Sequence, residues 1–294
     1  MKNKQTILIT GATGNIGGGA AFALAKRGTK IVLFGHNPET LESRANAIRA
    51  KLTEANINHK DTDVSTLVVD FTDLDSVSQS ATEALSRFTE INGLILCVGH
   101  LVQNGPNILP NGHELMFATS VIGPFLFTQL LVDRLEKSKG IVLQVIAPFY
   151  DEMDWNDIQS IKKHKTIIAY NRAKTCERVL IAELARRFAG KITSVAFNPT
   201  FIIDKSDPEL KKRWPKGFTG FIWWMAALLF SKPPEIAGEP IADIILSYKN
   251  ADNINGALYK LKKRIKKPDK AMKDQALGER LWNELLKLTK LTSI

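Results

Sequence analysis

Tyr170 and Lys174 are the two residues whose types and spacing most directly suggest chemistry. They stand four apart within residues 167–188, a stretch with helical periodicity, so both lie on one helix face about one turn apart. An ammonium beside a phenol favours the phenolate and lowers the pKa of the phenol toward neutrality. Such a tyrosine exchanges a proton with a carbonyl or alcohol oxygen. The same spacing is common on ordinary amphipathic helices, so the pair alone leaves a structural role open.

A glycine-rich turn near the N-terminus points to a second chemistry. An apolar run over residues 6–9 predicts a buried strand, glycines follow at positions 11, 14 and 17, and a helical pattern runs from Ala20 to Gly28. Gly11 permits the tight turn, Gly14 lets the backbone approach a phosphate, and Gly17 lets the helix pack on the strand. The amide-rich start of the helix then faces the anion. Strand, turn and helix in this order predict a dinucleotide site.

Alternating strand and helix patterns must position these residues. Strands are predicted at residues 30–35, 66–71, 91–99, 140–146 and 192–197, and helices at 37–54, 73–88, 112–136 and 167–188. The 112–136 helix should bend near Gly123 and Pro124. This alternation predicts an α/β fold: a single Rossmann-type doubly wound parallel sheet with helices on both faces, forming one domain over residues 1–294. Ligands of such sheets bind beyond the carboxyl ends of the strands. The residues expected there are Gly11, His36, Asp70, Gly99, Ile146 and Pro199.

The end of the second strand bears on cofactor choice. Sites that prefer NAD usually place an acid here to bind the adenosine ribose. This chain has Gly35, His36 and Asn37, with no acid to repel a 2′-phosphate and no arginine in the turn to attract one. We therefore expect NADP(H), with NAD as the alternative. His36 either approaches the phosphate or is a surface histidine.

Composition narrows the class of protein. Of the 294 residues, 44% are hydrophobic and 24% charged, as in soluble globular proteins. The only cysteines, Cys97 and Cys176, show no disulfide or metal-ligand spacing, and residues 1–4 lead directly into the first strand without a signal peptide. We expect a cytoplasmic protein that binds no metal. The net charge of +10, concentrated at residues 211–213 and 260–267, indicates either a solvated basic surface or an anionic partner, and no nucleic-acid motif accompanies it.

The segment after the sixth strand should lie on the substrate side. Residues 218–230 are apolar all round, but these 13 residues fall short of the roughly 20 that span a bilayer. They form a buried helix, a lid within residues 204–235 over a bulky apolar substrate, or an interfacial anchor that makes peripheral membrane contact through residues 211–230. An edge strand at 256–261 and a C-terminal helix at 268–290 should complete the chain. A homodimer is left open.

With these motifs in place, the sequence resembles the short-chain dehydrogenase/reductase family over nearly its whole length. The resemblance is carried by residues 10–17, Asp70, residues 96–99, the pair Tyr170 and Lys174, and Pro199-Thr200. Residues 154–158, 183–188, 256–259 and 281–285 make it most similar to the retinol-dehydrogenase-like branch. The resemblance implies hydride transfer between a nicotinamide and a carbonyl or alcohol carbon, with Tyr170 as proton donor or acceptor. Lys174 would lower the pKa of Tyr170 and hold the nicotinamide ribose, Asp70 would contact the adenine, and Gly99 would lie under a ribose.

The cofactor site that the resemblance implies draws on most of the strand ends. It comprises Gly11, Thr13, Gly14, Asn15, Ile16, Gly17, His36, Asn37, Asp70, Phe71, Val98, Gly99, Tyr170, Lys174, Pro199, Thr200 and Ile202.

The chain departs from the family on the substrate side. The family serine that holds the substrate oxygen has no hydroxyl counterpart near Ile146, and the family's helical asparagine is replaced by Ser120, the third candidate catalytic residue. A lost hydrogen bond of this kind costs about 100- to 1000-fold in turnover. Either Ser120, Gln144 or a water substitutes, giving an NADP(H)-preferring oxidoreductase of a small hydrophobic carbonyl or alcohol, or the chain is a catalytically weak dinucleotide-binding protein acting as sensor or scaffold.

Overall fold

One eight-stranded sheet forms the centre of the protein. The computed structural model describes residues 4–57, 64–99, 105–205, 225, 229–250, 253–266 and 269–291. The strand order is β3-β2-β1-β4-β5-β6-β7-β8, and every neighbouring pair is parallel except β7 with β8. The strands are β1 (Thr6–Thr10), β2 (Lys30–Gly35), β3 (Val64–Val68), β4 (Gly93–Leu96), β5 (Ile141–Val145), β6 (Thr193–Asn198), β7 (Ala257–Lys260) and β8 (Lys263–Arg264). β1, β4 and β5 are buried along their whole length, which explains their continuous apolar sequences.

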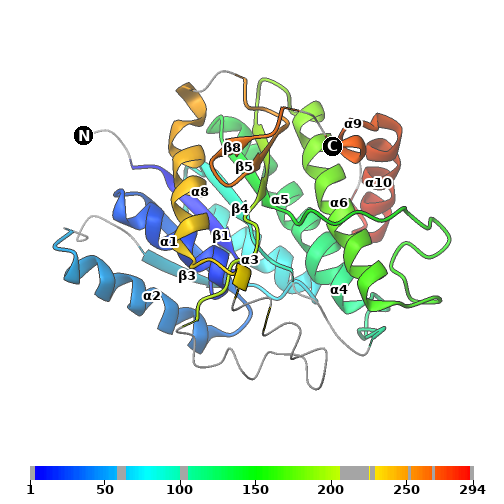
Figure 1. Ribbon diagram of the computed structural model, residues 1–294, viewed down its shortest axis with the longest axis horizontal. Coiled ribbons are helices and arrows are strands. Elements are labelled where there is room, and N and C mark those ends of the chain that lie inside the picture. The colour runs from blue at the N-terminus through cyan, green and yellow to red at the C-terminus, as the bar shows by residue number, and fades with distance from the viewer. Residues whose placement is uncertain are drawn as a thin grey trace.

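Helices cover both faces of this sheet (Figure 1). The buried side chains of α1 (Asn15–Lys26), α2 (Pro38–Glu54) and α8 (Glu235–Ser247) share one apolar cluster. Those of α3 (Leu74–Arg87), α5 (Gly123–Lys137), α6 (Thr166–Arg187) and α10 (Gln275–Leu288) share the other. The arrangement confirms the predicted α/β, Rossmann-type doubly wound sheet.

Most predicted elements appear within a few residues of their predicted bounds. The clearest shift is at α1, which begins at Asn15 rather than at Ala20, with Gly14 as its N-cap in an extended conformation. The three glycines before Ala20 thus belong to the helix, where their lack of a side chain serves close packing rather than turn formation.

The helix predicted to bend near Pro124 instead changes its hydrogen-bonding register. A short α4 (Leu115–Phe117) leads into a π-helical turn, Ala118–Ile122, and then into α5. Proline has no N–H for the residue four positions back and clashes with that carbonyl, here the one of Ser120. A widened π turn before Pro124 relieves both conflicts, and such turns are common at functional sites.

The stretch Leu115–Lys137 is also long and apolar enough to cross a membrane. Of its most apolar window, 89% is buried inside the fold. It therefore reads as a core helix of the sheet-and-helix sandwich.

The C-terminal region differs in detail from the single helix predicted over residues 268–290. It forms α9 (Lys270–Lys273) and α10, separated by Asp274, whose extended ψ of 96° ends the first helix and whose carboxylate caps the second at the N–H of Leu277. The predicted lid at residues 204–235 and the membrane contact at 211–230 fall mostly outside the described residues.

Candidate active site

The glycine turn between β1 and α1 is shaped by backbone contacts that exclude side chains. Gly11 has a φ of +61°, a left-handed conformation, and the N–H of Gly14 donates to its carbonyl at 3.0 Å. A Cβ on Gly17 would lie only 2.4 Å from the Gly11 carbonyl oxygen. The turn and the first turn of α1 are therefore pressed together, with the helix N-terminus at the end of β1.

Arg44 of α2 supports this turn from the side, a residue that reading the sequence missed. Its Nη2 donates to the carbonyl of Thr13 at 2.8 Å. The arginine stands nine residues beyond Gly35, so no local pattern links it to the turn. It brings a guanidinium against the glycine turn and the first turn of α1 at Gly18, where the sequence suggested no cation.

The β2 end itself presents His36 and Asn37. His36 is exposed, and Asn37 is the N-cap of α2, its side chain accepting from the N–H of Thr40 at 2.9 Å. The Asn37 side-chain oxygen thus caps the helix, and its backbone carbonyl accepts from the Thr40 hydroxyl and the Leu41 N–H. The cap does not use its side-chain NH2 group.

Asp70 follows β3 and is held by its own loop. Its Oδ1 accepts from the N–H and the hydroxyl of Thr72 at 2.9 and 2.7 Å. Phe71, by contrast, is buried and packs edge-on against Phe127, with ring centroids 5.8 Å apart. Of the two, only Asp70 offers a side chain to an adenine.

Gly99, at the end of β4, brings the catalytic candidates together. It has a φ of +143°, and a Cβ there would lie 2.7 Å from Lys174 Nζ and 3.3 Å from Ser120 Oγ. Val98 beside it is partly buried. Lys174 on α6, Ser120 in the π turn and the end of β4 therefore converge on one point, as predicted from separate motifs.

Tyr170 lies one helical turn from Lys174, as the spacing predicted. The Lys174 ammonium is 5.6 Å from the centre of the Tyr170 ring, and the Phe149 ring is 6.0 Å from it. Burial raises the pKa of Tyr170 above its usual value, the Lys174 charge lowers it, and Glu177 raises it again. The expected lowering toward neutrality is therefore wrong for this chain, because burial and Glu177 outweigh Lys174. Tyr170 is a neutral phenol at pH 7, the form that donates a proton.

Glu177 is the second residue of the candidate site that was not predicted from the sequence. Its Oε1 lies 2.6 Å from Lys174 Nζ in a buried ion pair. Positions 170, 174 and 177 follow i, i+4 and i+7, so all three lie on one helix face. That spacing is the signal that could have revealed Glu177.

The strand end that carries the family serine offers no hydroxyl. Ile146 is buried in the apolar cluster shared with α6, and its N–H donates to the Phe197 carbonyl at 2.8 Å. The amide of Gln144 is committed to the carbonyls of Val145 and Leu96, at 3.1 and 3.5 Å, so it is not placed to replace the serine. Ser120 stands beside Lys174 and remains the candidate hydroxyl.

Pro199, Thr200 and Ile202 follow β6. Thr200 has a φ of +67°, unusual for a β-branched residue, at the place where the family has glycine. Its N–H donates to Asn198 Oδ1 at 2.9 Å, and its hydroxyl is buried with no partner among the described residues. Ile202 is buried and forms an isolated parallel β-bridge with Lys232.

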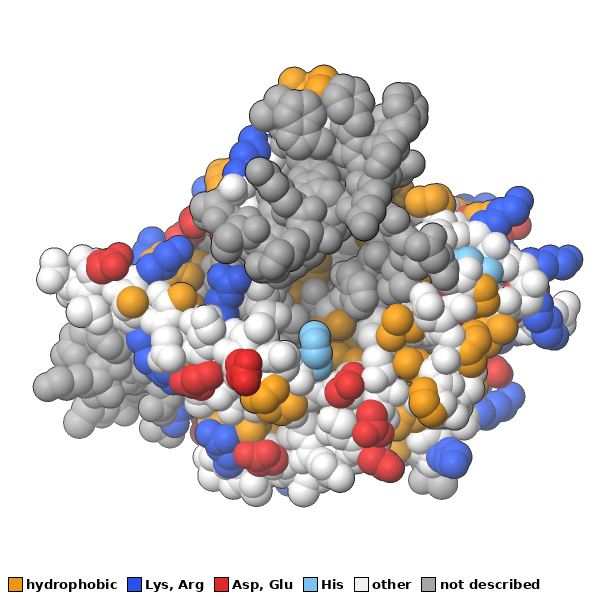
Figure 2. Space-filling model, turned by 90° about the horizontal axis from the view of Figure 1, so that it is seen from below, with side chains coloured by type: hydrophobic (Ala, Val, Ile, Leu, Met, Phe, Trp, Pro, Cys, Tyr) orange, Lys and Arg blue, Asp and Glu red, His pale blue; other side chains and the backbone are white. Residues whose placement is uncertain are grey.

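The face where the strands end is shown in Figure 2. Hydrophobic side chains gather on the side of this face that lies beneath α4 and α6. Large exposed apolar side chains near Tyr170 are Phe149, Tyr150 and Ile167. An apolar surface therefore borders the proposed acid.

These residues fit a dinucleotide. The glycine cradle at Gly11 and Gly17 leaves backbone where a Cβ would intrude, and the unpartnered Thr200 hydroxyl at the end of β6 is a buried group that a polar ligand could satisfy. Thr13, Gly14, Asn15 and Ile16 are partly exposed at the start of α1. The Gly14 N–H already donates to the Gly11 carbonyl, and the backbone amides of Asn15 and Ile16 at the helix start suit a phosphate.

Comparison with known proteins agrees with this geometry. A family model described as short chain dehydrogenase matches residues 5–207. Human retinol dehydrogenase 13 is 27% identical over 297 residues, covering 98% of this chain and 85% of that protein. A short-chain dehydrogenase/reductase of Armillaria gallica is 26% identical over 292 residues, covering 96% and 89%. The structure of the Pseudomonas aeruginosa RhlG/NADP active-site complex shares the fold, with a TM-score of 0.65 over 87% of this chain and 94% of that one, at 15% identity.

Proposed function

Because this chain belongs to the short-chain dehydrogenase family, we propose that it interconverts a carbonyl and an alcohol on a hydrophobic substrate, with NADP(H) as cofactor and Tyr170 as acid or base. It lies in the retinol-dehydrogenase-like branch and is an NAD(P)-dependent oxidoreductase of alcohols and carbonyl compounds. The NADP(H) preference, the hydrophobic substrate and the role of Tyr170 are the further content of the proposal.

The observation that carries the proposal is the convergence at Gly99. Lys174 and Ser120 approach this glycine from two helices, and Tyr170 stands one turn from Lys174 on the same face. The glycine turn lies at the end of the neighbouring strand, since β1 pairs with β4. A nucleotide held at the turn and a proton donor on α6 would thus lie at the same end of the sheet, beyond the carboxyl ends of β1 and β4.

Each residue then has a defined task. A bound reduced nicotinamide supplies the hydride in this chemistry. As the neutral phenol, Tyr170 gives its proton to the carbonyl oxygen in reduction, and in oxidation its phenolate takes a proton from the alcohol. Lys174 places a positive charge beside that phenol, and Ser120 offers the nearby hydroxyl for the substrate oxygen. Asp70 would accept from the adenine amine.

Arg44 supports the preference for NADP(H). Its guanidinium lies against Thr13 in the glycine turn, and neighbouring His36 and Asn37 bring no negative charge to the β2 end. An arginine close to the adenosine end of such a site suits a 2′-phosphate, and we infer that Arg44 has this role.

We expect Arg44→Ala to weaken NADPH binding by about tenfold or more, since a hydrogen bond to a charged group contributes about 1.5–3 kcal/mol. NADH binding should change much less, because it has no 2′-phosphate. Fluorescence titration with both cofactors measures this. Arg49→Ala is the control, because this arginine of the same helix donates to Glu42 and to the Val64 carbonyl and not to the glycine turn. Equal losses for NADPH and NADH would show that Arg44 only supports the turn.

The apolar border of Tyr170 supports a hydrophobic substrate. Phe149 is 51% exposed and Ile167 59% exposed. Such rings and alkyl groups recognise an extended apolar molecule, and the name retinol dehydrogenase indicates an apolar alcohol for the relatives.

The missing hydroxyl near Ile146 favours a second candidate, a nucleotide-binding protein of little activity. Consumption of NADPH with a panel of apolar aldehydes and ketones separates the two.

A further inference from the structure

Lys174 reaches the candidate active site through a buried region. Its side chain is 8% exposed and that of Glu177 1% exposed, and 2.6 Å separates the ammonium from Glu177 Oε1. A lysine buried without a partner loses its proton readily, because burial disfavours the charged form. The cation beside Tyr170 therefore depends on what surrounds it.

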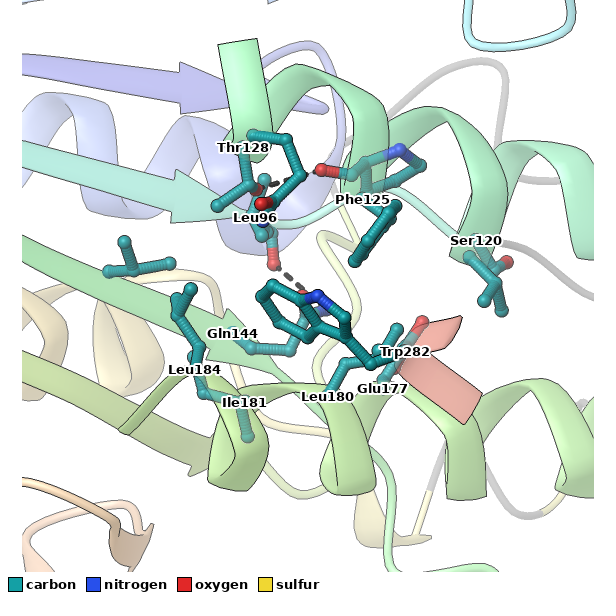
Figure 3. Close-up of a pocket in the computed structure, with 14 residues that line it drawn as sticks. Leu96, Ser120, Phe125, Thr128, Gln144, Glu177, Leu180, Ile181, Leu184 and Trp282 are labelled. Atoms are coloured by element: carbon teal, nitrogen blue, oxygen red, sulfur yellow. Dashed lines mark hydrogen bonds between the residues drawn. The ribbon is translucent and has the colours of Figure 1, made fainter. Parts of the chain in front are cut away.

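Glu177 also lines a small, mostly apolar cavity. Glu177 Oε2 and Gln129 Nε2 are buried without a hydrogen-bond partner among the described residues, and both residues line a cavity of about 30 Å³ between α5, α6 and α10. Figure 3 shows Glu177 beside Trp282 at this cavity, with Ser120 and Gln144 on its other walls. Most of its lining side chains are apolar, and Ser120, Thr128, Gln129 and Gln144 are its neutral polar groups. The cavity therefore offers the Glu177 carboxylate little stabilisation, and the ion pair with Lys174 Nζ is its closest charged contact.

The groups that face Glu177 leave Lys174 as its main charged partner. On α6 these are Lys174 and Arg178, and Arg178 is also engaged by Asp269 from α9. Cys97 after β4 has its thiol pKa raised to about 12 by desolvation, so it is neutral. Glu177 is the only charged residue among the described residues lining the cavity, and the other polar ones, Ser120, Thr128, Gln129 and Gln144, are neutral.

We propose that Glu177 is a positioning residue, the counter-ion that keeps Lys174 protonated in its buried place and so extends the pH range over which the Tyr170 site works. The pKa values agree with this direction. Burial works against the Lys174 cation, yet Glu177 and Tyr170 together raise the pKa of Lys174 above its usual value near 10.5. Burial raises the pKa of Glu177 to about 7, although Lys174 and Arg178 lower it, so its carboxylate is charged over the alkaline range in which Lys174 titrates. The link to catalysis rests on the function proposed above, whereas the ion pair itself does not.

The test observes Lys174 directly. Protein labelled with ¹³C at lysine Cε is titrated by NMR in the wild type and in Glu177→Gln, and the Lys174 signal is identified by its absence from Lys174→Met. We expect a midpoint above 10.5 in the wild type and a midpoint lowered by about 1–3 pH units in Glu177→Gln, since the ammonium stays buried and loses its partner. An unchanged midpoint in Glu177→Gln overturns the proposal. Should that variant not fold, a wild-type midpoint below 10.5 does so.

A kinetic readout and a matched control complete the experiment. The alkaline limit of kcat/KM for carbonyl reduction should fall with the Lys174 midpoint in Glu177→Gln, and a limit that stays in place while the midpoint falls contradicts the link to catalysis. Glu183→Gln removes another buried carboxylate of α6, one paired with Arg186 and Arg187. Glu183→Gln should leave the Lys174 midpoint and the alkaline limit of kcat/KM unchanged. Shifts equal to those of Glu177→Gln would show that both variants act by perturbing α6 in general, which contradicts a specific role for Glu177. A shifted midpoint in a protein without activity refutes the proposed function and leaves the ion-pair proposal standing.

Discussion

Tyr170→Phe is expected to lower kcat/KM for carbonyl reduction by about 10²–10⁴-fold, the usual contribution of a positioned acid. The substitution removes only the hydroxyl. The phenylalanine ring keeps the contacts with Phe149 at 6.0 Å and with the Lys174 ammonium at 5.6 Å, so the site should hold its shape. Steady-state kinetics measures the loss, and a fluorescence titration should find NADPH affinity unchanged.

Tyr248→Phe is the matched control. Tyr248 is a buried tyrosine whose hydroxyl donates to the Lys139 carbonyl at 2.7 Å. Lys139 precedes β5, so this hydrogen bond lies at the amino ends of the strands, opposite the candidate site. Losing that hydrogen bond should cost about 0.5–1.5 kcal/mol of stability and no activity. If Tyr170→Phe retained full kcat/KM, Tyr170 would not be the acid, whatever the fold.

Gly17→Ala is expected to weaken NADPH binding by about 10- to 100-fold. The new Cβ would stand 2.4 Å from the Gly11 carbonyl oxygen and 2.9 Å from its carbon, both backbone atoms that cannot rotate away. Overpacking of this kind costs about 1–3 kcal/mol, and the turn must shift away from the position that holds the pyrophosphate. Isothermal titration calorimetry gives the affinity, and circular dichroism reports whether the variant is folded.

Gly28→Ala is the control for Gly17→Ala, because it replaces a glycine at the end of α1 without creating a steric clash. Gly28 follows the other end of α1 with a φ of +78°, and a Cβ there meets nothing within 4 Å. Its left-handed conformation should cost about 1–2 kcal/mol of stability without affecting NADPH binding. Equal affinity in Gly17→Ala and the wild type would place the pyrophosphate elsewhere.

Reading the sequence could predict the fold because its signals are local. The apolar runs of β1, β4 and β5 stand between helical patterns, and a parallel sheet covered on both faces is the ordinary solution for such a chain. Local patterns could not predict the π turn at Ala118–Ile122, because proline is compatible with a kink, a break or a change of register. Packing in the folded protein selects among these.

The cofactor half of the site was also predictable, whereas its electrostatics were not. Gly11 and Gly17 lie where their motifs placed them, because close backbone contact admits little else, and Gly99 lies against the side chains of Lys174 and Ser120. Arg44 contacts Thr13 although the two residues are 31 positions apart in the sequence, and no spacing rule predicts such a contact. The pKa of Tyr170 was predicted in the wrong direction because the sequence reveals the Lys174 charge but neither the burial of the phenol nor the Glu177 carboxylate.

The most direct test of the central claim, an NADP(H)-dependent oxidoreductase acting through Tyr170, is NADPH consumption with a panel of apolar aldehydes and ketones. It is measured for the wild type and Tyr170→Phe at the same NADPH occupancy. We predict consumption with at least one carbonyl compound by the wild type and its loss in the variant. Micromolar NADPH binding without consumption for any member of the panel would contradict the claim and favour a nucleotide-binding protein that lacks the activity.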